Sequence, residues 1–137
     1  KGDLKMKKNL RIGDTASITK TITQEHVEQF AEISNDRNPI HLDDAFAKTT
    51  IFGRRVAHGM LVAGLFSGLL GQTLPGEGTI YLGQKLKFVK PVLIGDEVTA
   101  SVEITNIRED KPIITLKTVC ANHDGEVVID GEAVVRV

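Results

Sequence analysis

The stretch from Ser34 to His41 (SNDRNPIH) carries residue types that can transfer protons. The carboxylate of Asp36 and the imidazole of His41 lie five residues apart, and Pro39 stiffens the backbone between them. Such a pair can direct a base and a second proton-handling group at one reacting centre. In the alternative interpretation, Asp36 and Asn38 only hydrogen-bond the local backbone at a helix end, and His41 begins the next helix. The spacing alone leaves both interpretations open.

A second candidate lies at residues 57–60 (AHGM), where a long apolar stretch begins. Backbone N–H groups at the N-terminus of a helix, unobstructed at a glycine, can stabilise an oxyanion as it develops. Gly59 is therefore a candidate oxyanion donor, although it could equally serve only to let the helix pack closely. We interpret His58 as a residue that orders this turn.

A metal site is an alternative use of the same region, with His41, Asp43, Asp44 and His58 as ligands. Asp43 and Asp44 are instead typical of the acidic residues that begin a solvated helix, so we predict no metal site. Cys120 falls on an alternating strand pattern and is predicted to be a core residue rather than a nucleophile. The sequence contains no glycine-rich phosphate loop.

The composition of the chain favours one intracellular domain. Its 137 residues are 41% hydrophobic and 26% charged, which excludes disorder and low-complexity sequence. The 17 basic and 18 acidic residues give a net charge of −1, which argues against a nucleic-acid or anionic-membrane partner. The apolar run from Met60 to Leu70 would span about 16 Å as a helix, well short of the roughly 30 Å of a bilayer core. With one cysteine and no recognisable secretory signal, we expect a cytoplasmic protein.

The elements that must position these residues begin with a strand and a helix. Alternating residues predict a strand over 14–22, Thr23 is a good N-cap for a helix that ends before Pro39, and a short helical piece is expected around 43–48. Residues 59–70 are apolar on every side, which predicts a helix buried on every face.

Everything after this helix is predicted to be strand. Strands are expected over 82–89, 98–105, 113–120 and 126–137, with Asp124-Gly125 as a hairpin turn. This order favours an α+β fold in which a curved antiparallel sheet wraps a central apolar helix. It disfavours a parallel α/β fold, because no helices separate the later strands.

Several long motifs carry a resemblance to a known family. The MaoC-like (R)-specific enoyl-CoA hydratases, especially the small bacterial enzymes that feed polyhydroxyalkanoate synthesis, contain strings similar to DRNPIH, LDDAFA, VAHGMLVAGLFSGLLG, YLGQKLKFVKPVLIGDEV and REDKPIITL. The resemblance begins at about Asp14 and implies a hot-dog fold and a homodimer. It divides the chain into an N-terminal extension, residues 1–13, and one MaoC-like domain, residues 14–137. Met6 lies inside the extension, which leaves open whether residues 1–5 belong to the natural chain.

The resemblance also assigns site residues by position. The family's catalytic dyad falls on Asp36 and His41, and its oxyanion donor falls on the backbone N–H of Gly59. Asn38 matches the asparagine of the motif. The active-site serine of the central helix falls on Ser67, which is expected to support the dyad by a hydrogen bond or to shape the pocket.

The acyl pocket is expected beside the central helix, which is the only long apolar element available to line it. Its predicted wall consists of bulky apolar residues of the helix and one strand: Met60, Leu61, Leu65, Leu82 and Leu86. These residues predict a shallow pocket and a preference for enoyl chains of about four to six carbons. Gly64 stands where a slightly larger residue is expected, which would alter the pocket but not the reaction.

The reaction implied by the resemblance is the reversible addition of water to trans-2-enoyl-CoA, giving (R)-3-hydroxyacyl-CoA. Asp36 would act as the base, His41 would orient the water and deliver a proton, and the Gly59 N–H would stabilise the enolate. No cofactor is implied, because coenzyme A is part of the substrate. The stereochemistry rests on the resemblance alone.

Two alternative functions remain. Another hot-dog enzyme, either a 3-hydroxyacyl-carrier-protein dehydratase or an acyl-CoA thioesterase, would share the fold, and a thioesterase would direct its water at the carbonyl carbon. A non-catalytic acyl-CoA-binding domain is the second alternative. Such a domain would have no use for a base beside a water, which the set Asp36, Asn38, His41 and Gly59 provides.

Overall fold

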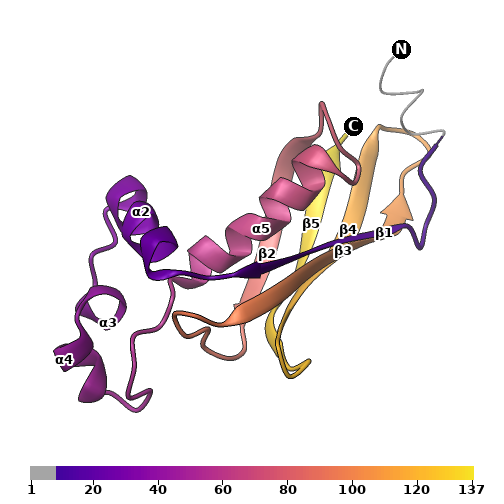
Figure 1. The fold of residues 1–137 in the computed structure, drawn as a ribbon. Helices are drawn as coiled ribbons and strands as arrows, with labels where there is room; N and C mark the ends of the chain where they lie inside the picture. Colours follow the sequence, from indigo (N-terminus) through magenta and orange to yellow (C-terminus); the bar gives the residue numbers. More distant parts are fainter. Residues whose placement is uncertain (1–8) are drawn as a thin grey trace.

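The computed structural model describes residues 9–137, which form one five-stranded antiparallel sheet with helices on one side (Figure 1). The strands lie in the order β1-β3-β4-β5-β2, so β1 and β2 form the two edges. Their bounds are β1 Thr15–Thr21, β2 Ile80–Phe88, β3 Glu97–Ile107, β4 Ile113–Asn122 and β5 Val127–Arg136. The predicted α+β class is confirmed, as is the predicted succession along the chain of one strand, a central helix and four further strands.

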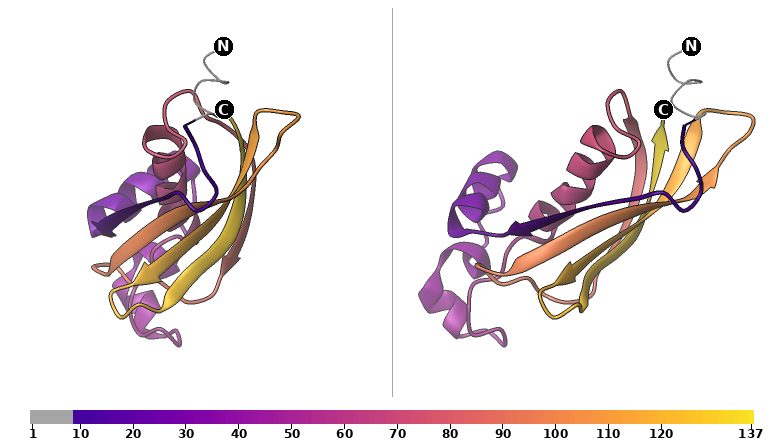
Figure 2. Two further views of the ribbon diagram at one scale, coloured as in Figure 1. Left: turned by 90° about the vertical axis from the view of Figure 1, so that its right-hand side faces the viewer. Right: turned by 45° about the vertical axis from the view of Figure 1, so that its right-hand side comes forward.

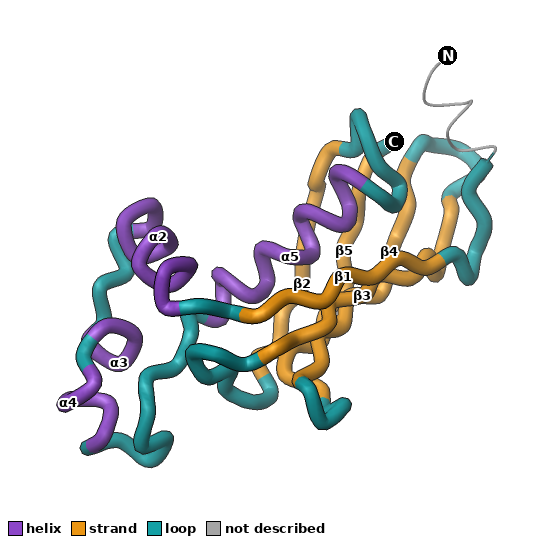
Figure 3. The backbone as a smooth tube through the Cα atoms, in the orientation of Figure 1, coloured by secondary structure: helices purple, strands orange, loops and turns teal. Residues whose placement is uncertain are grey.

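The helices lie in two places. The central helix α5, Gly59–Gln72, runs along the concave face of the curved sheet (Figures 1 and 2). Helices α2, Gln24–Ser34, α3, Pro39–Leu42, and α4, Asp44–Lys48, lie beyond one end of the sheet. Figure 3 shows that loops join these three short elements to β1 and α5. This outer segment carries Asp36 and His41, the residues of the predicted dyad, and ends at the start of α5.

The core lies between α5 and the inner face of the sheet. Because side chains alternate across a strand, every second residue of β3 and β4 points to the helix, and the fully buried set is Val98, Ala100, Val102, Ile104, Ile114, Leu116, Thr118 and Cys120. The helix contributes Val62, Phe66, Leu69 and Leu70. Burial raises the pKa of the Cys120 thiol to about 11, which confirms that this cysteine is a core residue rather than a nucleophile.

The sequence predicted that the central helix is buried on every face, but one side of it is exposed in this protomer. Met60, Gly64, Ser67 and Gly68 are exposed, because the sheet covers one side of α5 and leaves the other side open next to the edge strand β2. The helix α3 was not predicted as a separate element. It forms because Pro is favourable at the start of a helix and Asn38 provides the N-cap.

The start of the chain is tied to the sheet from residue 10 onward. Leu10 packs against the core, and the N–H of Gly13 donates to the carbonyl of Ile104 at 2.8 Å. Residues 1–8 of the predicted N-terminal extension lie outside the described residues. Among the described residues, no helix is long and apolar enough to cross a membrane.

Candidate active site

The loop after α2 is ordered by short-range hydrogen bonds. Asn35 ends the helix in the left-handed conformation, with φ of 63°. The Ser34 hydroxyl then accepts from the N–H of Asp36 at 3.1 Å, and Asp36 Oδ1 accepts from the N–H of Asn38 at 3.2 Å. Asp36 and Asn38 therefore do hydrogen-bond the local backbone, as the alternative interpretation of this stretch predicted. These same bonds hold the Asp36 carboxylate in one position.

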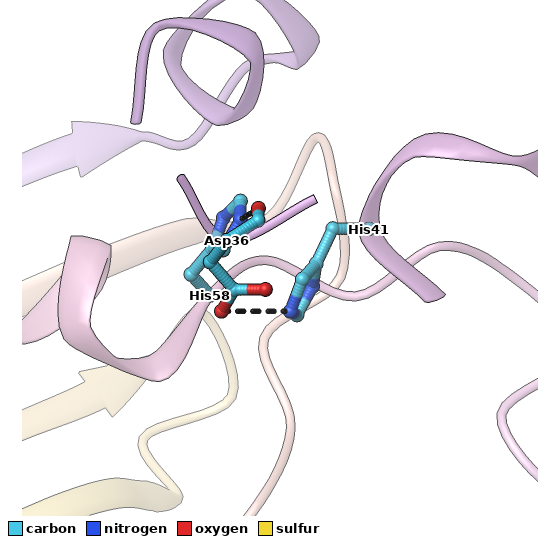
Figure 4. Close-up of side chains that lie close together, drawn as sticks. All are labelled: Asp36, His41 and His58. Carbon is cyan, nitrogen blue, oxygen red and sulfur yellow. Dashed lines mark hydrogen bonds and ion pairs between the residues drawn. The ribbon is translucent and has the colours of Figure 1, made fainter. Parts of the chain in front are cut away.

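The structure brings the two residues of the predicted dyad together (Figure 4). Asp36 Oδ2 lies 3.9 Å from His41 Nε2, which is too long for a direct hydrogen bond and suits a water molecule bonded to both. His41 Nδ1 lies 2.6 Å from the carbonyl oxygen of Val56. Because a carbonyl only accepts, Nδ1 carries the proton and donates it, and Nε2 of the neutral ring presents a lone pair on the Asp36 side.

The surroundings of His41 favour its neutral form. The His41 side chain is 12% exposed and the Asp36 side chain is 48% exposed. Burial lowers the pKa of His41 below its ordinary value, and the neighbouring His58 lowers it further; the hydrogen bond to Val56 and the charge of Asp36 oppose this shift without reversing it. At neutral pH the pair therefore offers a bound water two acceptors.

His58 joins this cluster more closely than the sequence indicated. Its side chain is buried, and its Nε2 lies 2.9 Å from the main-chain oxygen of Asp36. Its ring stacks on that of His41, with centroids 3.9 Å apart and planes 30° from parallel. The sequence signal that could have indicated this role is its position directly before Gly59, at the start of the helix.

The predicted oxyanion donor lies at an uncapped helix end. Gly59 is the first residue of α5, and His58 at the cap position makes no side-chain hydrogen bond to the first turn. A Cβ at Gly59 would lie 2.6 Å from the ring of Phe88, so the glycine also permits close packing. Both interpretations of Gly59 from the sequence therefore fit the structure.

A cavity of about 670 Å³ contains the dyad and the start of α5. Its wall is mainly apolar, with a few converging polar groups, as is typical of small-molecule sites. The residues that line it include Phe30, Ser34, Asp36, His41, Phe52, Val56, His58, Gly59, Met60, Phe88, Lys90, Val92 and Ile129. The aromatic residues Phe30, Phe52 and Phe88 were not among the predicted site residues, because α2, the loop between α4 and α5, and β2 supply them.

Asp36, His41 and His58 are also the described residues that come nearest to a metal site. Each offers one ligand atom, and these atoms lie within 4.8 Å of one another. The two imidazoles are stacked, however, so their nitrogens lie side by side instead of converging on one centre. One nitrogen of each ring bonds a carbonyl oxygen, which leaves the other nitrogen of each ring available. The arrangement suits proton transfer better than metal ligation.

The other two residues of the metal alternative point elsewhere. Asp43 Oδ1 accepts from the N–H of Phe46 at 3.1 Å and caps α4. Asp44 pairs with Arg55 at 2.8 Å. Both residues therefore act as acidic groups at a helix start, as the sequence predicted.

The remaining predicted site residues are spread over a wider area. Asn38 Oδ1 accepts from the N–H of Ile40 at 3.1 Å and caps α3, so it orients the short helix that carries His41. Ser67 lies eight residues beyond Gly59, about 12 Å along the helix axis. Within the described protomer, Ser67 is not among the residues that line the cavity of the predicted dyad.

Ser67 instead lines a second groove of about 420 Å³ between α5 and β2, together with Met60, Ala63, Gly64, Tyr81, Leu82, Gly83, Gln84 and Leu86. Met60 lines both this groove and the dyad cavity. Leu61 and Leu65, which also belong to the predicted wall, pack against the core and line neither of these two cavities. Leu61 and Leu65 are half-buried, whereas Met60, Gly64 and Ser67 are exposed on the open side of the helix.

Comparisons with known proteins agree with this architecture. A family model described as "MaoC like domain" matches residues 10–124. The chain is 56% identical over 128 residues to an (R)-specific enoyl-CoA hydratase from Aeromonas caviae, covering 93% of this chain and 96% of that protein. It is 47% identical over 129 residues to a protein of the same name from Rhodospirillum rubrum, covering 94% and 89%.

A solved structure supports the same assignment. It is an (R)-hydratase from A. caviae involved in PHA biosynthesis, and it superposes with a TM-score of 0.93 at 55% identity, covering 94% of this chain and 98% of that chain. The hot-dog arrangement of sheet and central helix predicted from the sequence is thereby confirmed. This chain belongs to the MaoC-like domain family.

Proposed function

We propose that this protein is an (R)-specific enoyl-CoA hydratase, a hydro-lyase that adds water reversibly to trans-2-enoyl-CoA and forms (R)-3-hydroxyacyl-CoA. The observation that carries the proposal is the 3.9 Å spacing between Asp36 Oδ2 and His41 Nε2 in a cavity that also contains the start of α5. The high identity to hydratases over nearly the whole chain supports it. The stereochemistry is taken from those relatives.

The dyad would hold and activate the water. A water bound to both acceptors directs its own oxygen lone pair at C3 of the enoyl group. Asp36 accepts the proton from the water as the hydroxyl adds to C3, and the proton returns through the pair to C2, with His41 orienting the water and delivering the proton. The pair ends the cycle in the protonation state in which it began, so no external acid or base is consumed.

The helix terminus would stabilise the charge that develops on the thioester. When the hydroxyl adds to C3, negative charge moves to the thioester oxygen as an enolate. The N–H of Gly59 lies at the positive end of the α5 dipole, and no side chain caps that turn. It is therefore suited to donate to this oxygen.

The groove between α5 and β2 is the best candidate for the acyl chain. It adjoins the dyad cavity at Met60 and is mainly apolar. The bulky residues Leu82 and Leu86 line it, so we expect kcat/KM to be highest for chains of about four to six carbons. A steady rise of kcat/KM from C4 through C6 and C8 to C12 would contradict this assignment.

A homodimer formed through β2 would cover the open side of each protomer. The edge strand β2 exposes Ile80 at 56%, Leu82 at 52% and Phe88 at 50%, and the open side of α5 exposes Met60 at 57%. A row of unpaired backbone groups beside apolar side chains is an unfavourable surface to leave in water. Pairing two such edges about a two-fold axis would bury both.

The proposed reaction requires no cofactor, because the residues of the site supply the base, the proton path and the oxyanion donor. Coenzyme A enters only as part of the substrate. We place the enzyme in the cytoplasm, where acyl-CoA thioesters and a single unoxidised cysteine are both expected.

The assay that tests the function uses crotonyl-CoA. A hydratase removes the enoyl absorbance without releasing free thiol, whereas a thioesterase releases thiol and a binding domain does neither. The same assay with crotonyl-acyl-carrier protein separates the hydratase from a carrier-protein dehydratase. Thiol release or absence of turnover with crotonyl-CoA would overturn the proposal.

A further inference from the structure

His58 makes a directional contact with the main chain of Asp36. Its Nε2 lies 2.9 Å from the Asp36 carbonyl oxygen, and the side chain is 2% exposed. Because the carbonyl can only accept, Nε2 carries the proton and donates it. Nδ1 has no hydrogen-bond partner among the described residues. Because Nδ1 then carries a lone pair and no proton, the ring has no unsatisfied donor. The bond to Asp36 therefore fixes one tautomer of the His58 ring.

The same ring also supports His41. It stacks on the His41 imidazole at 3.9 Å between centroids, and Phe30 packs against it at 4.8 Å with a tilt of 56°. The His41 ring is thus held in its plane by the bond from Nδ1 to Val56 and against one face by His58. The Nε2 atom of His41 has little freedom to leave its position near Asp36.

The backbone of His58 begins the helix that carries the oxyanion donor. Its carbonyl oxygen accepts from the N–H groups of Leu61 at 3.1 Å and Val62 at 3.3 Å, which closes the first turn of α5. The position of Gly59 follows directly from this turn. His58 therefore contacts the main chain of Asp36 and the ring of His41, and it directly precedes Gly59.

We propose that His58 is a positioning residue. Its Nε2–H holds the main chain of Asp36 and the face of its ring holds the ring of His41, so that both groups keep a fixed position relative to the N–H of Gly59. The inference rests on the proposed hydratase activity for its kinetic consequences. The titratable groups that face the His58 ring are His41, from α3, and Asp36, from the preceding loop. From α2, the uncharged ring of Phe30 packs against the His58 ring.

The charged group nearest to this cluster on the remaining wall of the cavity is Lys90, which follows β2 and pairs with Glu126. His58 is therefore placed to act through geometry, because the described residues give its ring no other charged partner to bind.

Three substitutions separate the two contacts. In His58→Gln the amide nitrogen reaches about as far as Nε2, so the bond to Asp36 can persist without the ring. In His58→Asn the amide nitrogen takes the place of Nδ1, so both the bond and the ring are lost. In His58→Phe the ring remains and the donor is lost.

For hydration of crotonyl-CoA, we expect His58→Asn to lower kcat by about 10- to 100-fold with little change in KM, because a misplaced dyad slows the chemical step more than binding. His58→Gln and His58→Phe should each retain more activity than His58→Asn. The control is His123→Gln, at an exposed histidine beside a turn, which should leave kcat unchanged. Equal kcat in the Asn and Gln variants would overturn the proposal.

A second measurement does not depend on turnover. Ring nitrogen NMR of the unsubstituted protein should show His58 protonated at Nε2 alone, and in His58→Asn the pKa of His41 should move up toward its ordinary value as water replaces the ring. A proton on Nδ1 of His58 would overturn the proposal. If the unsubstituted protein has no hydratase activity, the proposed function is overturned instead. The NMR measurement of the His58 tautomer does not depend on that outcome.

Discussion

The Nδ1 atom of His41 lies 2.6 Å from the carbonyl oxygen of Val56, and this contact decides which nitrogen of the ring can serve the reaction. Val56 belongs to a short extended segment that bonds Ile40 on one side and Leu93 on the other. Since its carbonyl only accepts, it holds the proton on Nδ1 and leaves Nε2 to accept from water. In the proposed mechanism, the dyad therefore requires a neutral His41.

This relationship predicts an acidic limit to activity. Burial lowers the pKa of His41 from its ordinary value of 6.5, so the neutral ring persists to lower pH than a free histidine would. We expect kcat/KM to fall on the acidic side with a midpoint below 6.5, because protonation removes the lone pair of Nε2. The measurement is the pH profile of kcat/KM for crotonyl-CoA. A midpoint above 6.5 would contradict the prediction.

Removal of either dyad group should slow the chemistry without unfolding the protein. We expect Asp36→Asn and His41→Gln each to reduce kcat by about 10²- to 10⁴-fold, the usual range for positioned acid–base groups. Asp124→Asn, in the exposed turn between β4 and β5, is the matched control and should have no effect. A dyad variant with near-normal turnover of crotonyl-CoA would remove that residue from the mechanism.

A methyl group at Gly59 should have little effect on the stability of the protein but should lower its activity. In Gly59→Ala the new Cβ would lie 2.6 Å from the Phe88 ring, which must move. Because Phe88 is 50% exposed, the ring can move at little cost in stability, but it shifts within the dyad cavity. We expect kcat/KM to fall by about 10-fold, a modest positional loss.

The double variant Gly59→Ala/Phe88→Leu tests this steric explanation. Leucine is shorter than the phenylalanine ring and should relieve the clash, so activity should recover relative to Gly59→Ala. Phe88→Leu alone supplies the baseline for this comparison. No recovery in the double variant would show that the methyl group acts on the N–H of Gly59 and not through Phe88.

The open side of α5 should control acyl chain length. A Cβ at Gly64 or at Gly68 meets nothing within 4 Å, but only Gly64 lines the groove beside β2. Gly64→Val should therefore lower kcat/KM for C6 relative to C4 by several-fold, since each lost methylene contact is worth about 0.8 kcal/mol. Gly68→Val, one turn along, carries the same side chain and should leave the ratio unchanged. An equal change of the C6/C4 ratio in the two variants would show that the acyl chain does not occupy the groove beside β2.

The dimer should depend on one edge of the sheet and not on the other. A lysine at an exposed apolar position of a paired edge would bury a charge, so Leu82→Lys on β2 should weaken association. Ile18→Lys on the opposite edge, β1, is the control and should not. Sedimentation velocity over a range of concentrations measures both. If only Ile18→Lys dissociates the dimer, the interface lies at β1 and not at β2. If the unsubstituted protein is a monomer, the proposed dimer is wrong.

Much of the fold could be predicted because its signals are local. The alternation of β3 and β4, the Thr23 cap and the turn at Gly125 are all consequences of short-range geometry, and each lies close to its predicted place. The pairing of Asp36 and His41 is also local, since a loop held by Ser34 and a cap at Asn38 connect them. A single sequence is sufficient for such features.

Other features depend on contacts between distant segments. The stack of His58 on His41, the bond from His58 to Asp36 and the approach of Phe88 to Gly59 join residues 17 to 29 positions apart, and no short spacing signals them. The open side of α5 is a further example. An apolar helix indicates burial on every face, but only the curvature of the sheet and the position of β2 decide which face a single protomer leaves uncovered. The chemical groups and their local order follow from short-range sequence signals, whereas the distances between these groups, the tautomer of the His41 ring and the apolar surfaces left open follow from contacts between distant segments.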